Sequence, residues 1–370
     1  MDVVLAFLGA FSFLQTIIAF IIVIGLLVFF HEFGHFIAAK KANMLVEEFA
    51  LGFGPAIWSK KRGETQYSLR AVPLGGFCKM AGEMPADEET EKELEEENPK
   101  LKEAREEGRL FYQKPSWQRF IVIAMGPIMN FVLAILLLAS VFVIFGLPVE
   151  PSDSTRIGDV IPQNPAAEAG LRAGDRIIAI DGTPVDHWDE MAAIISAHPE
   201  EEITVRIDRR GEEFSVSLAP KIGEDGSGAI GIYPDVVREP IPVLPAIGMG
   251  TLQTVDMIGA LFQALGEMIT GRAPADVGGP VRIAQMVGEA AQVGMDYLMT
   301  FAAFISINLG IINLLPIPAL DGGRLIFLIV EMVRRKNLDP EKEGMVHFIG
   351  FIFLLILIGI IIIRDITQIF

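Results

Sequence analysis

The chain is short of residues that other protein classes depend on. Its one cysteine, Cys78, cannot form an intramolecular disulfide, so there is no disulfide framework. Basic residues number 30 against 47 acidic ones, and the net charge of −17 argues against a nucleic-acid partner. No basic segment precedes the first apolar run, so we expect no cleavable signal peptide. Histidine is also scarce, with five residues in 370.

What the chain has in excess is apolar sequence. It is 51% hydrophobic with a mean hydropathy of +0.46, which is typical of a polytopic membrane protein that also carries a soluble part. Four apolar runs are long enough to cross a bilayer, and the third of them is interrupted by asparagines and prolines: about 14–39, 120–145, 299–315 and 348–363. We therefore predict about four transmembrane helices.

Basic clusters indicate the orientation. Residues 40–41 and 60–62 follow the first run, and residues 334–336 lie between the third and fourth, so the positive-inside rule places both loops in the cytoplasm. Both termini and the segment between the second and third runs are then outside. Residues 243–270 are apolar but carry Gln253, Asp256, Gln263 and Glu267, and we interpret them as an amphipathic helix on the outer membrane surface. If they crossed the membrane instead, the 334–336 cluster would lie on the wrong side.

Two of the five histidines form the motif His31-Glu32-Phe33-Gly34-His35, at the end of the first apolar run. On a helix, HExxH puts both imidazoles on one face, where they can bind one Zn²⁺, and places the glutamate to take a proton from water. Chance occurrence of the motif, with ordinary interfacial histidines, is the alternative. Ionisable residues inside a membrane segment are costly, and a hydrolytic zinc site is a strong reason for them.

A catalytic zinc site needs a third protein ligand. The segment 313–323, NLLPIPALDGG, breaks the third apolar run with two prolines, and freed backbone groups at membrane depth are tolerated only in protein or beside a cavity. Asp321 lies at the cytoplasmic end of this broken run, at about the depth of His31 and His35, and is the best candidate. Taken alone, Asp321 could equally cap the helix that follows; the HExxH motif favours ligation.

Two further regions are read from their patterns. Residues 46–80 alternate polar and apolar around Gly63, and Thr65–Arg70 is predicted as one arm of a β-hairpin. Residues 83–108 are dense in glutamate and lysine, which indicates a solvated helix or a mobile segment.

Residues 150–236 are predicted to form a compact soluble module that resembles a PDZ domain. A short helix at 164–171, a glycine turn, a strand at 176–180 and paired strands at 203–207 and 214–218 carry the resemblance. The loop 228–232 resembles a PDZ carboxylate-binding loop in a circularly permuted arrangement, with Ala229, Ile230, Gly231 and Ile232 as peptide-binding residues. Capture of a peptide C-terminus and use as a steric cap over the membrane site are both left open.

Together, HEFGH, NxxPxPxLDG and the intervening PDZ-like module resemble the site-2 protease family of intramembrane metalloproteases, in particular the bacterial regulator-of-sigma-E protease group in a single-PDZ form. The resemblance covers essentially the whole chain. It implies that His31, His35 and Asp321 bind Zn²⁺ and that Glu32 is the catalytic acid/base. It also implies a substrate-binding or core role for Asn130, in the 126–130 segment GPIMN, and for Asn313 and Pro316. The hairpin resembles the family's membrane-reentrant loop, which gives Gln66, Tyr67, Ser68 and Leu69 as substrate-binding residues; the segment 278–281 matches a family feature without clear chemistry.

The expected function is intramembrane cleavage of single-span proteins, anti-sigma factors or similar, after an extracytoplasmic cut by an upstream site-1-type protease, in a stress response at the bacterial inner membrane. Clearance of remnant signal peptides, a non-catalytic PDZ scaffold and a zinc transporter are the alternatives, although ligands clustered at one depth speak against transport. The predicted division begins with a first transmembrane helix with HExxH (1–45), a cytoplasmic loop with hairpin and charged helix (46–117) and a second transmembrane helix (118–147). An extracytoplasmic PDZ domain (150–236) and membrane-surface helices (240–292) follow. A third transmembrane segment (293–325) and a cytoplasmic turn with the fourth helix (326–370) complete the chain.

Overall fold

The computed structural model describes residues 2–83, 98–151, 154–161, 164–223, 226–272, 278–336, 338 and 340–369. It divides into two compact units, which we describe separately. The membrane unit comprises residues 1–141 and 243–370, and the inserted unit comprises residues 142–242.

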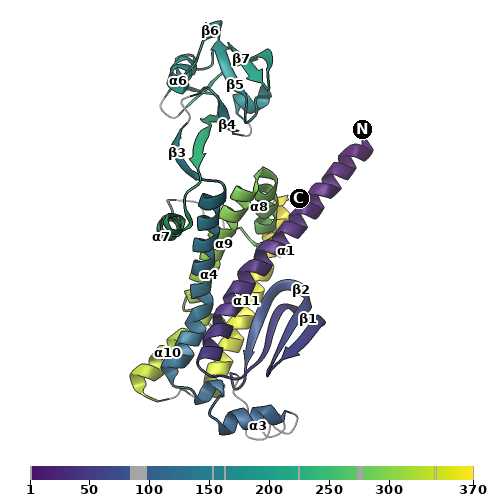
Figure 1. Cartoon of the computed structure of the whole chain (residues 1–370), viewed down its shortest axis with the longest axis vertical. Coiled ribbons are helices and arrows are strands. Elements are labelled where there is room, and N and C mark those ends of the chain that lie inside the picture. Colours follow the sequence, from purple (N-terminus) through teal and green to yellow (C-terminus); the bar gives the residue numbers. More distant parts are fainter. Residues whose placement is uncertain are drawn as a thin grey trace. The chain divides into compact units, whose positions relative to one another are not determined.

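Long helices dominate the membrane unit (Figure 1). Among the described residues, four segments are long and apolar enough to cross a membrane: 13–41, 116–144, 295–314 and 342–367. They belong to α1 (Asp2–Lys41), α4 (Ser116–Ile144), α9 (Met295–Leu314) and α11 (Pro340–Ile369). The predicted polytopic class is confirmed. The prolines that interrupt the third run lie beyond the end of α9, and α10 (Asp321–Arg334) begins after them.

A core of aliphatic and aromatic side chains joins α1, α4, α9 and the shorter α8 (Pro280–Val293), with Leu27 of α1 fully buried in it. α8 lies so close to α1 that a Cβ at Gly288 would overlap the Thr16 side chain. The remaining long helix, α7 (Val243–Ile269), is not among the four candidate spans. It crosses α4, and Figure 1 shows it nearly end-on beside that helix; at Gly250 a Cβ would lie 2.9 Å from the carbonyl oxygen of Ile135.

Two long, bent strands, β1 (Val46–Arg62) and β2 (Thr65–Met80), form the sheet of the membrane unit. Each strand supplies two arms, because the register shifts at the glycine-rich bends. The first arm of β1, 46–51, pairs with 66–69 on one side and with 76–80 on the other, and 66–69 also pairs with 58–61. The order across the sheet is therefore 56–62, 65–70, 46–51 and 76–80, which leaves 56–62 and 76–80 as its edges.

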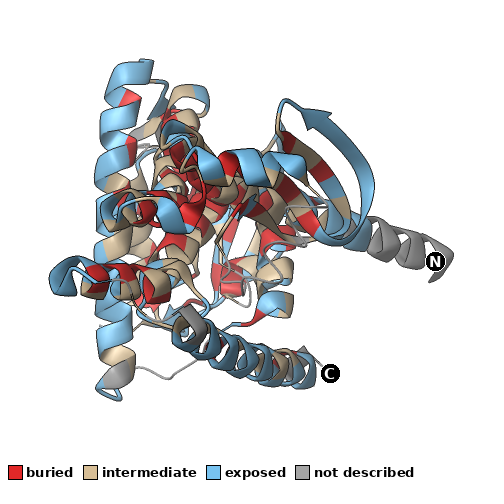
Figure 2. Cartoon of the chain, turned by 90° about the horizontal axis from the view of Figure 1, so that it is seen from below, coloured by how far each residue is buried: buried red, intermediate tan, exposed pale blue. Residues whose placement is uncertain are grey.

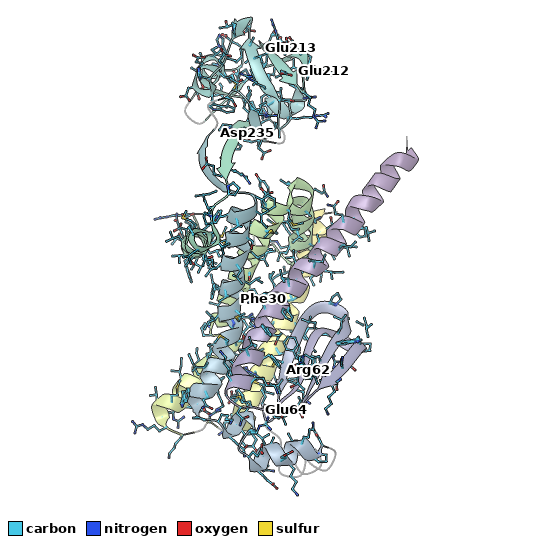
Figure 3. The ribbon with its side chains drawn as sticks, viewed as in Figure 1. Phe30, Arg62, Glu64, Glu212, Glu213 and Asp235 are labelled. Carbon is cyan, nitrogen blue, oxygen red and sulfur yellow. The ribbon has the colours of Figure 1, made fainter. Side chains whose placement is uncertain are left out.

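Charged contacts hold the turn of this sheet to the neighbouring elements. Glu64, at the turn, accepts hydrogen bonds from Lys40 at the end of α1 (2.7 Å) and from Arg109 (2.7 and 2.8 Å); Figure 3 shows Glu64 at the end of the sheet nearest α3. α3 (Pro99–Glu106) and the 3-10 turn η1 (Phe111–Gln113) follow. Of the charged segment predicted at 83–108, residues 84–97 lie outside the described residues, and α3 is the helical part.

The inserted unit is built around a four-stranded antiparallel sheet in the order β6-β5-β7-β8. Its inward side chains, such as Ile177, Ile203 and Ile207, pack against Met191 of α6. The predicted strand pair is confirmed, with Val205 opposite Val216. The unit begins earlier and ends later than the predicted 150–236, because β3 pairs with β12 at its base. Its elements are β3 (Leu147–Pro151), β4 (Ile157–Val160), α5 (Pro165–Glu168), β5 (Arg176–Ile180), β6 (Thr183–Pro184), α6 (Trp188–Ser196), β7 (Ile203–Arg209), β8 (Glu212–Leu218), β9 (Lys221–Ile222), β10 (Gly228–Ala229), β11 (Ile232–Pro234) and β12 (Val236–Glu239).

Candidate metal centre and active site

Three potential ligand atoms meet between α1 and α10. The Oδ2 atom of Asp321 lies 3.1 Å from Nε2 of His31 and 3.4 Å from Nε2 of His35, and the two Nε2 atoms are 3.4 Å apart. Ligand atoms of a tetrahedral zinc ion with bonds of about 2.0 Å are separated by about 3.3 Å. The arrangement therefore matches the spacing of three ligands around one ion. His31, His35 and Asp321 are thus a group that could hold a metal ion.

Glycines allow the helices to approach closely enough for this geometry. His31 and His35 face the same way because they are four residues apart in α1. At Gly34 of α1 a Cβ would overlap the carbonyl oxygen of Met125 in α4, and at Gly126 a Cβ would overlap the imidazole of His35. The Gly126 position thus leaves room for the ligands, and larger residues at either glycine would push α1 and α4 apart.

The second nitrogen of each imidazole has a buried partner. Nδ1 of His35 lies 2.9 Å from the carbonyl oxygen of Val122, and Nδ1 of His31 lies 3.1 Å from the side-chain amide of Asn130. A carbonyl partner requires a proton on Nδ1 of His35, which leaves its Nε2 free as a ligand. Asn130 is fully buried, and its Oδ1 atom has no hydrogen-bond partner among the described residues. Because amide oxygen and nitrogen are assigned by their surroundings, turning this amide lets Oδ1 accept the Nδ1 proton of His31.

The residues fit a zinc ion on these grounds. In the described part of the chain, the buried Oδ2 atom of Asp321 has no hydrogen-bond partner, although it faces two imidazole nitrogens. A carboxylate oxygen and two oriented imidazoles are a ligand set of catalytic zinc sites, in which a fourth position stays open. The unsatisfied oxygen and the orientation of both imidazoles are explained together by a cation at this point.

The turn between α9 and α10 places Asp321. α9 ends at Leu314, and Ala319 adopts a left-handed backbone with φ of +77°, which costs an L-residue about 1–3 kcal/mol. At Gly322 a Cβ would overlap the carbonyl oxygen of Leu315, so the turn folds back closely on the start of α10. The N-cap residue of α10 is Leu320 rather than Asp321. The carboxylate of Asp321 is therefore directed to the histidines and is not the cap of its helix.

A cavity of about 650 Å³ opens beside the three ligand atoms. Glu32 lines it next to His31, which puts a carboxylate within the same space as the potential ligands. The other polar walls come from the sheet and from α10 and α11, and they include Lys79, Glu83, Arg324 and His347. Arg324 donates to Glu83 across the cavity wall, which joins α10 to the end of β2.

The edge arm 76–80 of the sheet forms another wall of this cavity, through Phe77, Cys78, Lys79 and Met80. At Gly76 a Cβ would lie 3.2 Å from Cγ of Glu32, so this arm runs past the candidate general base. The predicted substrate-binding residues Gln66, Tyr67, Ser68 and Leu69 lie elsewhere. Their arm is internal, paired with 46–51 on one side and 58–61 on the other, so its backbone is not a free edge.

Three further residues of the membrane unit, for which a substrate-binding or core role was predicted, do not line this cavity. Asn130 contacts His31 instead, and neither Asn313 nor Pro316 lines the cavity. In the inserted unit, Ile230 of the predicted peptide loop is buried in the core. Gly231 has a left-handed φ of +78° and lies close to the Asn164 side chain.

The contact between Asn130 and His31, and the cavity positions of Arg324 and His347, were not predicted from the sequence. For His347, the sequence offered one indication of a functional role, which is that histidine is rare in this chain.

Comparison with known proteins gives the same assignment. The family profile described as peptidase family M50 matches residues 19–357. Zinc metalloprotease RasP of Geobacillus kaustophilus is 38% identical over 96% of this chain and 99% of its own length. The regulator of sigma-W protease RasP of Bacillus subtilis is 36% identical, covering 97% and 100%, and the probable protease eep of Enterococcus faecalis is 34% identical, covering 96% and 100%. A PDZ domain of an SdrC-like protein from Listeria monocytogenes matches 24% of this chain and 92% of its own, at 23% identity and a TM-score of 0.21.

The fold and the site define an integral membrane metallopeptidase whose HExxH motif lies in a membrane-spanning helix. The chain belongs to peptidase family M50, the site-2 protease family, and is a zinc metalloendopeptidase. The resemblance drawn from HEFGH and NxxPxPxLDG is confirmed, as is the polytopic membrane class.

Proposed function

We propose that His31, His35 and Asp321 hold one Zn²⁺ and that Glu32 is the general base of an intramembrane proteolysis reaction. The convergence of three ligand atoms beside a cavity that also contains Glu32 carries this proposal. Bound zinc would supply Lewis-acid activation of water and of the scissile carbonyl. Glu32 accepts the proton of the attacking water and returns it to the leaving amine.

The substrates we propose are transmembrane segments of single-span proteins. A helical segment hides its carbonyl groups in its own hydrogen bonds, so it must unwind before cleavage. In the described part of the chain, no further strand pairs with the outer side of the edge arm 76–80, which runs beside Glu32, and an unwound segment can pair with it as an added strand. Strand pairing fixes the backbone of the substrate and is indifferent to most of its side chains, which suits an enzyme that acts on varied apolar segments.

Basic residues and the name of a relative support an orientation and a physiological role for the protein. The basic residues at the end of α1 and in the last turn of α10 support a site toward the cytoplasm, with the inserted PDZ-like unit outside. The name of the Bacillus subtilis relative, regulator of sigma-W protease, supports a role in regulated intramembrane proteolysis with anti-sigma factors as substrates, after a first cut by a site-1-type protease. Clearance of remnant signal peptides is the alternative substrate class.

The decisive test compares wild type with Glu32→Gln on a single-span test protein that lacks its outer domain. The purified proteins are assayed in lipid, and zinc content is measured on both. We expect cleavage by wild type alone with equal zinc in the two proteins. The matched control is Glu47→Gln, which neutralises another carboxylate of the same cavity and should cleave within a few-fold of wild type. Cleavage by Glu32→Gln would refute its role as base, and zinc with no cleavage by wild type on any truncated substrate would favour a scaffold.

A further inference from the structure

The last helix of the chain, α11, touches the rest of the membrane unit at few points. Of its described residues, Gly350 and Asp365 are the buried ones, and Figure 2 shows the helix that ends at the C-terminus exposed along nearly its whole length. Near its end, the Asp365 carboxylate accepts hydrogen bonds from the backbone N–H groups of Gly279 (3.1 Å), Val281 (3.2 Å) and Arg282 (3.1 Å) at the start of α8. The other joint lies beside the metal centre.

At this second joint, α11 contacts the turn that leads into Asp321. Nδ1 of His347 accepts a hydrogen bond from the backbone N–H of Ala319 at 2.9 Å. One turn further along α11, a Cβ at Gly350 would overlap the ring of Pro318, so helix and turn are in close contact. The ring of Phe327 in α10 packs edge-on against the imidazole, with centroids 5.4 Å apart and an angle of 62°. The imidazole is therefore held between the turn and α10.

The backbone of the turn is strained at Ala319, and His347 accepts a hydrogen bond there from outside the turn. Ala319 has a left-handed φ of +77°, a conformation that glycine adopts readily and alanine does not. Its neighbours hydrogen-bond within the turn, Ile317 N–H to the carbonyl of Leu315 and Leu320 N–H to the carbonyl of Ile317, whereas the N–H of Ala319 is satisfied by His347. Ala319 lies two residues before Asp321, so a change in this turn moves the third ligand.

Accepting through Nδ1 also fixes the tautomer of His347. In the neutral ring the proton must then be on Nε2. This atom is buried and has no hydrogen-bond partner among the described residues, and the His347 side chain lines the cavity. Its nearest carboxylate oxygen, Glu343 Oε1, is 3.9 Å away. Two roles are thus open to this side chain: an acceptor that holds the turn through Nδ1, or a donor to substrate through Nε2.

We propose that His347 is a positioning residue, which holds the strained turn at Ala319 through Nδ1 and thereby aims Asp321 at the metal. The inference rests on the proposed function, in which Asp321 is the third ligand. The other joint of α11, at Asp365, holds the start of α8, so a variant there shows whether attachment of the helix is by itself sufficient.

Side-chain mimics separate the two nitrogens. Asn carries a polar atom close to the position of Nδ1, and Gln carries one close to that of Nε2, so we compare His347→Asn, His347→Gln and His347→Leu in the full chain. The readout is zinc retention in competition with a chelator, which does not depend on proteolysis; cleavage of the single-span test protein is measured in parallel. We expect His347→Asn to stay near wild type and the other two to lose zinc about 10–100-fold more readily, the usual effect of removing support for a metal ligand.

A second variant tests the mechanism. Ala319→Gly removes the backbone strain, so combined with His347→Leu it should restore part of the lost zinc affinity. Asp365→Asn, which weakens the other joint of the same helix, should leave zinc retention unchanged. The proposal is overturned if His347→Gln behaves as wild type while His347→Asn does not, if all three variants retain zinc, or if Ala319→Gly gives no rescue. Asp321→Asn reports on the proposed function itself: if this variant keeps zinc normally, the ligand assignment fails, and the role of His347 fails with it.

Discussion

The side-chain amide of Asn130 lies 3.1 Å from Nδ1 of His31, and the amide is fully buried. This contact joins α4 to His31 of α1, the first of the three proposed zinc ligands. With its oxygen toward the imidazole, Asn130 fixes the proton of His31 on Nδ1, which leaves Nε2 free to bind a metal. Groups in this position usually contribute a factor of about 10–100 to metal affinity.

We therefore expect Asn130→Leu to bind zinc about 10–100-fold more weakly than wild type, and Asn130→Asp, which keeps an acceptor oxygen, to retain most of the affinity. Competition with a chelator of known affinity measures this. The matched control is Asn308→Leu, because Asn308 also lies in a spanning helix but donates to the carbonyl of Phe304 in its own helix (2.9 Å). Equal loss of zinc in both asparagine variants would mean that a general packing defect, and not the contact with His31, is responsible.

A second prediction concerns the edge arm 76–80, which we propose pairs with the substrate. In a Cys78→Ala, Glu32→Gln background, which has no native cysteine and cannot cleave, Lys79→Cys should form a disulfide with a cysteine placed near the scissile bond of the substrate. Lys61→Cys should not, although both lysines are exposed, because Lys61 lies on the opposite edge of the sheet. The cross-linked pair is identified by non-reducing electrophoresis and mass spectrometry. Cross-linking at Lys61 alone would place the substrate on the wrong edge.

The parts of the site that the sequence predicted are those fixed by local geometry. His31 and His35 share a face because any helix places residues i and i+4 together. Asp321 could be proposed because two closely spaced prolines disfavour a continuous helix and because a carboxylate at that depth needs a partner. The paired strands around Gly211 could be predicted from alternation and turn residues, and they form as expected.

What the sequence did not reveal depends on contacts between distant segments. The arm 66–69 has the alternation of a strand, but whether it is an edge depends on pairing with 46–51 and 58–61 after both strands bend. The partner of Asn130 is 99 residues away, and that of His347 is 28 residues away across a break between helices. Neither distance is encoded in any local pattern, so both residues required the structure.

A third prediction concerns the acid stability of the inserted unit. Burial raises the pKa of the Asp175 carboxyl, but hydrogen bonds from the Arg209 side chain (2.7 Å) and from the backbone N–H of Arg172 (2.8 Å) outweigh it, and the net pKa is lowered. A carboxyl with a depressed native pKa stabilises the fold fully above its unfolded pKa of about 3.9, and this contribution is lost as the pH falls toward the native value. The inserted unit should therefore lose stability below about pH 4.

Fluorescence of Trp188, which packs against the core of that unit, measures this in the full chain once Trp58 and Trp117 are replaced by phenylalanine. Asp175→Asn should be less stable at neutral pH and should show a weaker dependence on pH between about 5 and 2. An unchanged pH profile in Asp175→Asn would assign the acid sensitivity to other carboxyl groups.

The last prediction concerns a buried ion pair that joins α4 to α10, the helix that begins with Asp321. Arg119 donates to Glu331 at 2.6 Å, with side chains 9% and 4% exposed, and Glu331 also accepts from Ser116 (3.2 Å) and from the backbone N–H of Leu338 (3.0 Å). Removing one partner leaves an uncompensated buried charge, so Arg119→Met or Glu331→Leu alone should lower the free energy of unfolding by about 3–5 kcal/mol.

The double variant Arg119→Met, Glu331→Leu should recover most of that loss, because replacing both charges by apolar side chains of similar volume also removes their desolvation cost. Unfolding in detergent by increasing SDS fraction, followed by circular dichroism, gives the four free energies of a double-mutant cycle. The control is the pair between Lys79 and Glu47 (2.9 Å), in which the lysine is 61% exposed and whose removal should change stability by less than about 1 kcal/mol. Additive losses in the buried pair would show that the two charges act independently, and the C-terminal half of α10 would then be held by its apolar contacts alone.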